Sequence, residues 1–179
     1  MNFNLSKFNN DWYKPGSKLK IFCWMIISAV FFETFFPWPN KIKKIILVRF
    51  GANIGTGVVI KPHVQIKYPW FFSVGNYSWI GEHVWIDNLA MVRIGDNSVI
   101  SQGVYLCTGN HDFKKETFDL MLGEIMIGNS VWIGAKSVLS PKVSISDRVI
   151  VSLGSVVKKS IDQPGIYAGN PAVFIKENS

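Results

Sequence analysis

Three histidines are the side chains of this 179-residue sequence whose chemistry is easiest to foresee. An imidazole has an unperturbed pKa near 6.5, so at neutral pH it can accept a proton from a hydroxyl group that attacks a carbonyl carbon. His111 ends the run TGNH and precedes a long break in the repeat described below, whereas His63 and His83 are twenty residues apart. We therefore interpret His111 as a candidate general base. The alternative is a histidine that only hydrogen-bonds the adjacent loop.

The repeat that must position these histidines has a period of six residues. From Ile54 onward an aliphatic residue recurs every six positions, and a second period of twenty relates Ile54, Val74 and Ile94. Three hexads and two extra residues therefore make one turn of chain, and successive turns stack about 4.8 Å apart through parallel strand pairing. The aliphatic residue points inward, and a small residue follows it where the chain bends. The pattern predicts an all-β solenoid over residues 51–179 and argues against an antiparallel sheet, in which a period of two would dominate.

One long excursion interrupts the repeat. Between Leu106 and Ile127 the spacing exceeds one hexad by fifteen residues, so residues 112–125 are expected to leave the prism as a loop. Long loops on a rigid scaffold are commonly functional, and His111 lies immediately before this one.

Residues 1–50 lack the period and are expected to form one or two helices that cap the open end of the core. Their apolar stretch, residues 21–36, is shorter than the ~20 residues that span a bilayer, and it contains Glu33. Lysines flank it on both sides, within residues 14–20 and 41–44. Two interpretations of residues 14–44 stay open: a helix packed on the protein or at a subunit contact, and a helix lying in the surface of an anionic membrane.

Charge and composition narrow the choice of partners. The net charge of +7 favours an anionic partner, and no nucleic-acid-binding motif is recognisable, so we expect a phosphate-bearing cofactor or an anionic membrane rather than nucleic acid. Cys23 and Cys107 match no metal-ligand spacing and favour a reducing compartment. Residues 1–20 are too polar for a cleavable signal peptide. We therefore expect a cytoplasmic protein, either free or peripheral on the inner membrane.

Several motifs carry a resemblance to a known family. The hexads, together with YLCTGNHD, VWIGA and the closing YAGNPA, resemble the hexapeptide-repeat acyltransferases over nearly the whole chain. RFGANIG and SWIGEHVWIDNLAMVRIGDN are most similar to the branch of colanic-acid and capsule-polysaccharide O-acetyltransferases. The resemblance implies a left-handed parallel β-helix, a homotrimer, and His111 as general base. It also implies acetyl-CoA as donor, no metal, and a sugar hydroxyl of a bacterial surface-polysaccharide precursor as acceptor, free or lipid-linked. A longer acyl donor and an amine acceptor on a nucleotide sugar remain open.

The resemblance extends to the acceptor site. It implies that Asp87, Asn88 and Asp112 bind the acceptor, although Asp and Asn also make corner hydrogen bonds in any coil. The second ring nitrogen of His111 needs an anchor that fixes its tautomer. Asp112, Glu124 or a backbone carbonyl would provide it.

The cofactor-binding residues that the resemblance implies are Trp132, Gly134, Ala135, Leu153, Lys158, Lys159 and Lys176. Ala135 stands where relatives carry serine, so main-chain N–H groups would stabilise the oxyanion. Leu153 replaces a small residue and would narrow the groove, and Val173 replaces an arginine that would contact phosphate. Trp132 is either a wall of the groove or an outward aromatic at a subunit contact.

Two other classes of function remain open. His63 and His83 occupy the same place in adjacent coils, so they should stack and could share zinc, as in the β-helical carbonic anhydrases. Position 103 in the next coil is glycine, so a third ligand would be His111 or a residue of a neighbouring subunit. The other alternative is a non-catalytic trimeric scaffold, which predicts no CoA binding.

Overall fold

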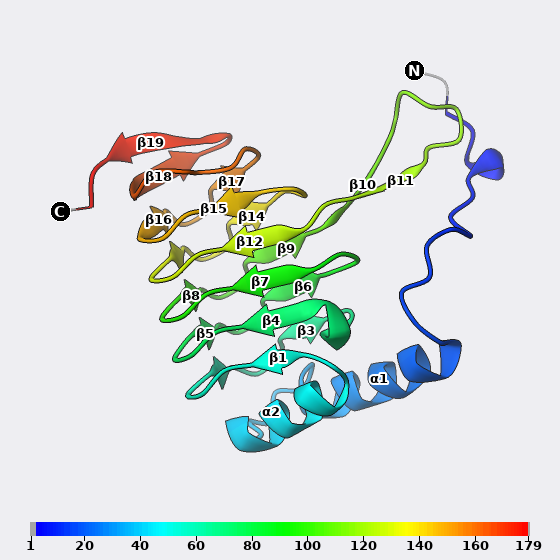
Figure 1. Cartoon of the computed structure of the whole chain (residues 1–179), viewed down its shortest axis with the longest axis horizontal. Helices are drawn as coiled ribbons and strands as arrows, with labels where there is room; N and C mark the ends of the chain where they lie inside the picture. The colour runs from blue at the N-terminus through cyan, green and yellow to red at the C-terminus, as the bar shows by residue number, and fades with distance from the viewer. Residues whose placement is uncertain (1–2, 179) are drawn as a thin grey trace.

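The computed structural model describes residues 3–178 and shows a parallel β-solenoid standing on two N-terminal helices (Figure 1). Three columns of short parallel strands form its faces. The first face contains β1 (Asn53–Ile54), β4 (Phe72–Val74), β7 (Val92–Ile94), β12 (Ile125–Ile127) and β15 (Ser144–Ile145). The second contains β2 (Val59–Ile60), β5 (Trp79–Ile80), β8 (Val99–Ile100), β13 (Trp132–Ile133), β16 (Val149–Val151), β18 (Gly165–Gly169) and the antiparallel β19 (Ala172–Lys176). The third contains β3 (Gln65–Ile66), β6 (Trp85–Asp87), β9 (Tyr105–Cys107), β14 (Val138–Leu139) and β17 (Val156–Val157).

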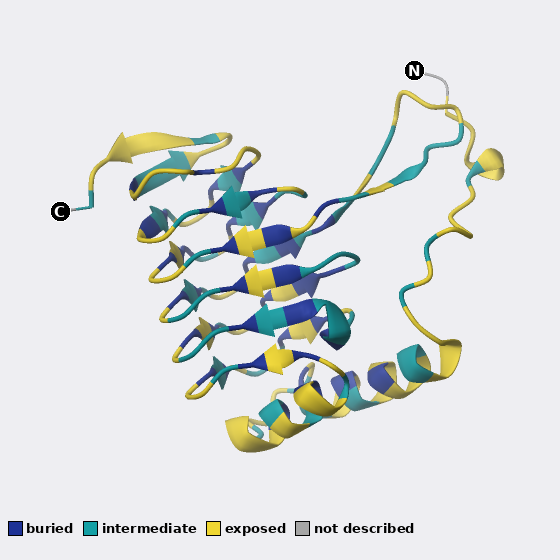
Figure 2. Ribbon diagram, viewed as in Figure 1, coloured by how far each residue is buried: buried dark blue, intermediate teal, exposed yellow. Residues whose placement is uncertain are grey.

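The core consists of the hexad aliphatic residues stacked in columns. Ile60 pairs with Ile80, and Ile80 pairs with Ile100, so the twenty-residue period places equivalent side chains directly above one another. All three are buried, whereas the residue before each of them in its strand is partly or fully exposed, so buried and exposed positions alternate along the strands (Figure 2). Stacking these columns removes the apolar surface of the inward side chains from water. This hydrophobic burial supplies most of the driving force for folding. The predicted solenoid is confirmed.

A small residue is required after each inward aliphatic residue for a different reason from the one predicted. The left-handed backbone of the corner lies two positions further on, at His83 (φ 57°) and Gly103 (φ 67°). Gly81, which follows Ile80 directly, is small because a Cβ there would lie 2.6 Å from the backbone nitrogen of Gln102 in the next coil. The interpretation of this position as the bend is therefore wrong. Close stacking of the coils excludes a side chain there.

Substituting Gly81 with alanine should lower the free energy of unfolding by about 3 kcal/mol, because the new methyl group meets rigid backbone rather than a movable side chain. Gly154 is the matched control. Its φ is +68° and an added Cβ would meet nothing within 4 Å, so Gly154→Ala should cost only about 1 kcal/mol of backbone strain. Urea unfolding followed by circular dichroism measures both, and equal losses would contradict the stacking explanation.

The two predicted N-terminal helices are present as α1 (Lys18–Phe31) and α2 (Asn40–Arg49), with short 3₁₀ turns η1 (Leu5–Lys7) and η2 (Pro69–Phe71). Trp24 and Leu47 join the hydrophobic core under the first coil, and the Trp24 indole donates to the carbonyl of Ile66 at 2.7 Å. Lys43 is buried and donates to the carbonyl of Ile60 at 2.9 Å, and burial lowers its pKa. The helices thus supply donors to the open strand edge. Neither helix, nor any other in residues 3–178, has the length and apolarity to cross a membrane.

The excursion is an antiparallel hairpin of β10 (Gly109–His111) and β11 (Leu120–Leu122) that projects from the prism between its third and first faces (Figure 1). It leaves the prism earlier than residue 112, and it returns before Ile125, which is fully buried in β12. His111 therefore belongs to the hairpin itself and not to a coil corner beside it.

Candidate active site

His111 is the last residue of β10, and its imidazole is held by the opposite arm of the hairpin. Nδ1 lies 2.9 Å from the carbonyl oxygen of Phe118. Since a carbonyl can only accept, Nδ1 carries a hydrogen, and in the neutral imidazole Nε2 therefore keeps its lone pair. Among the three anchors considered from sequence, the structure selects a backbone carbonyl. Asp112 instead accepts from the backbone N–H of Lys114 at 3.0 Å and shapes the hairpin turn, and Glu124 is exposed.

Aromatic rings fix the orientation of His111. The Phe118 ring stacks on the imidazole with centroids 4.4 Å apart and an interplanar angle of 5°, and Phe8 packs at 5.5 Å. Phe118 adopts a left-handed backbone (φ 49°), which is unusual for a bulky residue. Such strain persists only where the surroundings determine the conformation, and here it aims the carbonyl at the imidazole.

An N-terminal arm, residues 3–16, lies beside the hairpin and was not foreseen from the sequence (Figure 1). The N–H of Asn4 donates to the carbonyl of Glu116 at 2.8 Å, Lys7 pairs with the Glu116 carboxylate at 2.7 Å, and the rings of Phe3 and Phe118 are 4.7 Å apart. Further along, the Tyr13 hydroxyl donates to the carbonyl of Leu89 at 2.6 Å. The arm thus contacts the hairpin tip and the third face.

The arm left one signal in the sequence. Phe3, Phe8 and Tyr13 are aromatic residues at intervals of five in a mainly polar segment that also contains Leu5 and Trp12. Each contacts the hairpin or the coil beside it. Aromatic residues spaced along a mainly polar stretch suit a segment that packs through a few anchors.

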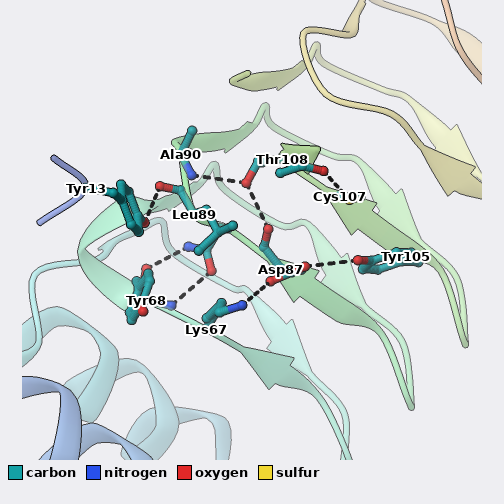
Figure 3. Close-up of polar contacts among 11 residues, drawn as sticks. Tyr13, Lys67, Tyr68, Asp87, Leu89, Ala90, Tyr105, Cys107 and Thr108 are labelled. Carbon is teal, nitrogen blue, oxygen red and sulfur yellow. Dashed lines mark hydrogen bonds and ion pairs between the residues drawn. The ribbon is translucent and has the colours of Figure 1, made fainter. Parts of the chain in front are cut away.

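Asp87 is the centre of a polar cluster on the third face, below the hairpin (Figure 3). Its carboxylate accepts from the Lys67 ammonium at 2.9 Å and from the Tyr105 hydroxyl at 3.0 Å, and the residue is buried. Its backbone carbonyl accepts from the hydroxyl of Thr108 at 2.8 Å. Through these contacts Asp87 fixes the positions of the Lys67 ammonium and the Tyr105 hydroxyl.

Asn88, by contrast, exposes no side-chain atom to an acceptor. It is fully buried, its side-chain oxygen accepts from the N–H of Tyr68 at 3.0 Å, and its amide donates to the carbonyls of Tyr68 and Phe71. These contacts are the structural hydrogen bonds of a coil corner, which was the other role expected for Asn88 from the sequence. Asn88 shapes the corner that carries Tyr68.

Two tyrosines near Asp87 stay protonated at neutral pH. Burial raises the pKa of Tyr13 well above its ordinary value, and the charges of Tyr68 and Asp87 raise it further. Burial likewise raises the pKa of Tyr105, with added contributions from its hydrogen bonds to Cys107 and Asp87. Both hydroxyls therefore act as hydrogen-bond donors throughout the physiological range.

A hollow of about 490 Å³ opens beside the imidazole. Its size falls within the ~300–1,000 Å³ of small-molecule sites. The arm, the third face and the hairpin all contribute to its lining: Phe8, Asn10, Tyr13, Pro15, Lys67, Tyr68, Leu89, His111 and Leu120. It is a mixed polar and aromatic environment into which His111 faces.

A second groove, of about 430 Å³, lies on the second face. Four of the seven residues expected to bind the cofactor line it, namely Trp132, Gly134, Ala135 and Leu153. Leu153 lines the opening and is 79% exposed. Trp132 points outward, 52% exposed, and its indole donates to the Ser101 hydroxyl at 2.9 Å.

The three lysines expected to contact phosphate do not line this groove. Lys158 and Lys159 are exposed just after β17 on the third face. Lys176 ends β19, paired in register with Ile166, which does line the groove. Val173 is exposed on the same strand. Of these three lysines, Lys176 is therefore the one that pairs in register with a residue of the groove.

His63 and His83 stack as predicted, with ring centroids 4.5 Å apart and an interplanar angle of 6°. They lie on the corner between the second and third faces, whereas His111 leaves from the corner between the third and first. Within residues 3–178, no three His, Cys, Asp or Glu side chains are grouped closely enough to hold a metal ion. A zinc site here would need a third ligand from outside the described chain.

The imidazole and the groove lie on opposite sides of one chain. The hairpin leaves the corner between the third and first faces, and in a three-sided prism that corner is opposite the second face, which carries the groove. A reaction that used both would need the groove of a second copy beside the His111 of the first.

The solenoid is the fold of known acetyltransferases. It matches the crystal structure of a maltose O-acetyltransferase from Clostridium difficile 630 with a TM-score of 0.79 and 22% identity, over 90% of this chain and 89% of that one. A galactoside acetyltransferase in complex with coenzyme A also matches with a TM-score of 0.79, at 25% identity, over 90% and 82% of the two chains. No family model matches the sequence.

Sequence similarity identifies the family. The chain is 37% identical over 169 residues, 92% of its length, to the proposed colanic acid biosynthesis acetyltransferase WcaF of Escherichia coli K12, and the match covers 91% of that protein. The chain therefore belongs to the hexapeptide-repeat acetyltransferases and is an acyltransferase. The resemblance inferred from its motifs is confirmed.

Proposed function

We propose that the protein transfers an acetyl group from acetyl-CoA to a sugar hydroxyl of a surface-polysaccharide precursor, with His111 as general base. The observation that carries this proposal is the Nδ1 contact to the Phe118 carbonyl, because it leaves the basic Nε2 available beside a hollow. WcaF is named for colanic acid biosynthesis, and the galactoside relative was solved with coenzyme A, which supports this donor and this acceptor class.

In the proposed reaction, Nε2 of His111 removes the proton of the acceptor hydroxyl while its oxygen attacks the thioester carbonyl carbon. The imidazolium then returns the proton to the departing CoA sulfur, so His111 ends each cycle as it began. Phe118 holds the ring in one tautomer throughout. Main-chain N–H groups near Ala135 would stabilise the oxyanion, since alanine offers no side-chain donor.

The proposal includes a homotrimer in which each site uses two chains. His111 of one copy would face the groove of Trp132, Gly134, Ala135 and Leu153 of the next, because one chain presents them on opposite sides. Lys158, Lys159 and Lys176 remain predicted phosphate contacts. Asp87 and Asp112 remain predicted neighbours of the acceptor.

Incubating the protein with acetyl-CoA and a panel of sugars and lipid-linked sugars tests the function. Thiol release that depends on the acceptor, with a product heavier by one acetyl group, is expected. Acetylation of amines alone would show that the acceptor group is an amine rather than a sugar hydroxyl. Failure to bind acetyl-CoA would favour the scaffold alternative.

The N-terminal arm should matter for turnover more than for stability. Of residues 3–10 only Phe8 is partly covered, so deleting residues 1–10 should leave the melting temperature nearly unchanged. Loss of Phe3, Lys7 and Phe8 frees the hairpin, and a loosely held base should lower kcat/KM by roughly tenfold to a hundredfold. Lys7→Ala, which removes one exposed ion pair, is the matched mild variant. Unchanged kcat/KM in the deletion would show that the arm has no role.

We also propose that the protein works in the cytoplasm, peripherally bound to the inner membrane through residues 14–44. Leu19, Phe22, Ile26 and Val30 of α1 and Phe35 after it are exposed by 49–80%. Ten of the 19 Lys and Arg residues, but two of the 12 acidic residues, lie within the first 81 positions. An apolar helix face bordered by cations suits an anionic lipid surface.

Replacing Phe22 and Ile26 together with serine should abolish co-flotation with phosphatidylglycerol vesicles while leaving the fold intact, since both side chains are exposed. Met126, 48% exposed on the first face, is the control, and Met126→Ser should float like the unaltered protein. Absence of flotation by the unaltered protein would reject the membrane contact and favour a subunit contact.

A further inference from the structure

A second hollow continues the one beside His111 toward the N-terminal helices. It has a volume of about 310 Å³ and lies between α1 and the third face. Lys67 and Tyr68 line both hollows, so the two are adjacent along the surface. The lining of the second hollow also includes Met25, which is 63% exposed on α1. The two adjacent hollows together are therefore lined by residues from His111 at one side to α1 at the other.

The lining of this second hollow combines fixed aromatic faces with hydrogen-bonding groups. The Trp85 ring is 44% exposed and stacks on Tyr105 with centroids 4.7 Å apart, and Tyr105 is in turn held by Asp87. On the facing side, Glu33 accepts from the Ser28 hydroxyl at 2.8 Å. Gln65 is exposed on β3 beside Trp85. The ring of Trp85 is thus already oriented before any ligand arrives.

This composition suits a sugar. One face of a pyranose ring carries C–H groups that pack on an aromatic ring, while its hydroxyls require donors and acceptors around the edge. A fatty chain would cover the charged groups of Glu33 and Lys67 and leave the exposed amide of Gln65 without a partner, which is costly for polar groups under an apolar ligand. Affinity for flexible ligands benefits when the site needs no rearrangement.

We infer that the hollow between α1 and the third face binds the sugar adjacent to the one that is acetylated, so the acceptor is an oligosaccharide of at least two residues. This inference rests on the proposed function and extends it. The sugar next to His111 receives the acetyl group, its neighbour lies on Trp85, and the remainder of the acceptor leaves past Met25 toward the membrane-facing side of α1.

The test uses the full-length protein, acetyl-CoA and size-graded acceptors. Surface polysaccharide from the producing cells is de-O-acetylated with base, cut by partial acid hydrolysis, and separated into fragments of one to four sugars. kcat/KM is measured for each size by thiol release and product mass. Fragments of two or more sugars should exceed the single sugars on the order of tenfold, the gain expected from one additional stacked contact.

Trp85→Ala should bring the ratio between fragments and single sugars close to one, and Gln65→Ala should reduce it partly. Met126→Ala, on the first face and outside both hollows, should preserve the ratio. Equal kcat/KM for all sizes in the unaltered protein, or a Trp85→Ala variant that keeps the full ratio, overturns the second subsite and leaves the transferase proposal standing. Acetylation of no fragment of any size refutes the proposed acceptor itself.

Discussion

His111→Ala is expected to lower acetyl transfer to the acceptor by roughly a hundredfold to ten-thousandfold, the range that general-base catalysis provides. A sugar hydroxyl is almost un-ionised at neutral pH, so without Nε2 its oxygen must attack with the proton still attached. The loss should fall on kcat, because the hollow that binds the acceptor and the groove on the second face remain. Steady-state kinetics with acetyl-CoA measures it.

His83 provides the matched control for this experiment. It is an exposed histidine with a left-handed backbone (φ 57°), and His83→Asn keeps a residue type that tolerates this conformation. Full activity is expected from this variant. His111→Ala should keep the melting temperature and oligomeric state of the unaltered protein, because its ring packs on residues of the hairpin and the N-terminal arm rather than in the core. If His111→Ala turned over normally, the imidazole would have no part in the chemistry.

Mixed oligomers should recover activity from two inactive variants. His111→Ala removes the base but keeps the groove, and Ala135→Trp fills the groove but keeps the base. If each site combines the His111 of one copy with the groove of the next, random assembly of equal amounts leaves roughly a quarter of the sites with both parts intact. Each variant alone should be almost inactive. Restored activity is therefore a gain from near zero.

Co-expression with two different affinity tags isolates the mixed species for assay. Mixing the separately purified variants without subunit exchange is the control and should give no activity. Co-purified mixed oligomers that remain inactive would show that base and groove act within one chain, or that the groove does not hold the donor. Light scattering on the same sample establishes the number of copies.

Periodicity alone was enough to predict the architecture. Ile60, Ile80 and Ile100 stack as the twenty-residue spacing requires, and the stacking of His63 on His83 follows from the same register. These predictions succeed because a solenoid is built from contacts between each coil and the next, so a local repeat contains the information. The role of the small residue was misjudged, since contact between coils, not the bend, excludes a Cβ at Gly81.

The candidate site was predicted in part. His111 and the four groove residues were identified from motifs, and the structure gathers those four into one groove. The carbonyl of Phe118, the arm and the second hollow were not. Each depends on where a non-repeating segment folds back, and neither the five-residue spacing of Phe3, Phe8 and Tyr13 nor their composition states what they contact.

The sequence by itself determined that the chain is a solenoid, where the repeat is broken, and which histidine stands at the break, because repeated hydrophobic contacts between neighbouring coils are encoded locally. The tertiary structure decided which nitrogen of His111 is free and that the side chain of Asn88 is buried in the hydrogen bonds of a coil corner. It also decided that the His111 base and the groove lie on opposite sides of one chain. These outcomes depend on hydrogen bonds and packing between segments far apart in the sequence, whose partners no local pattern specifies.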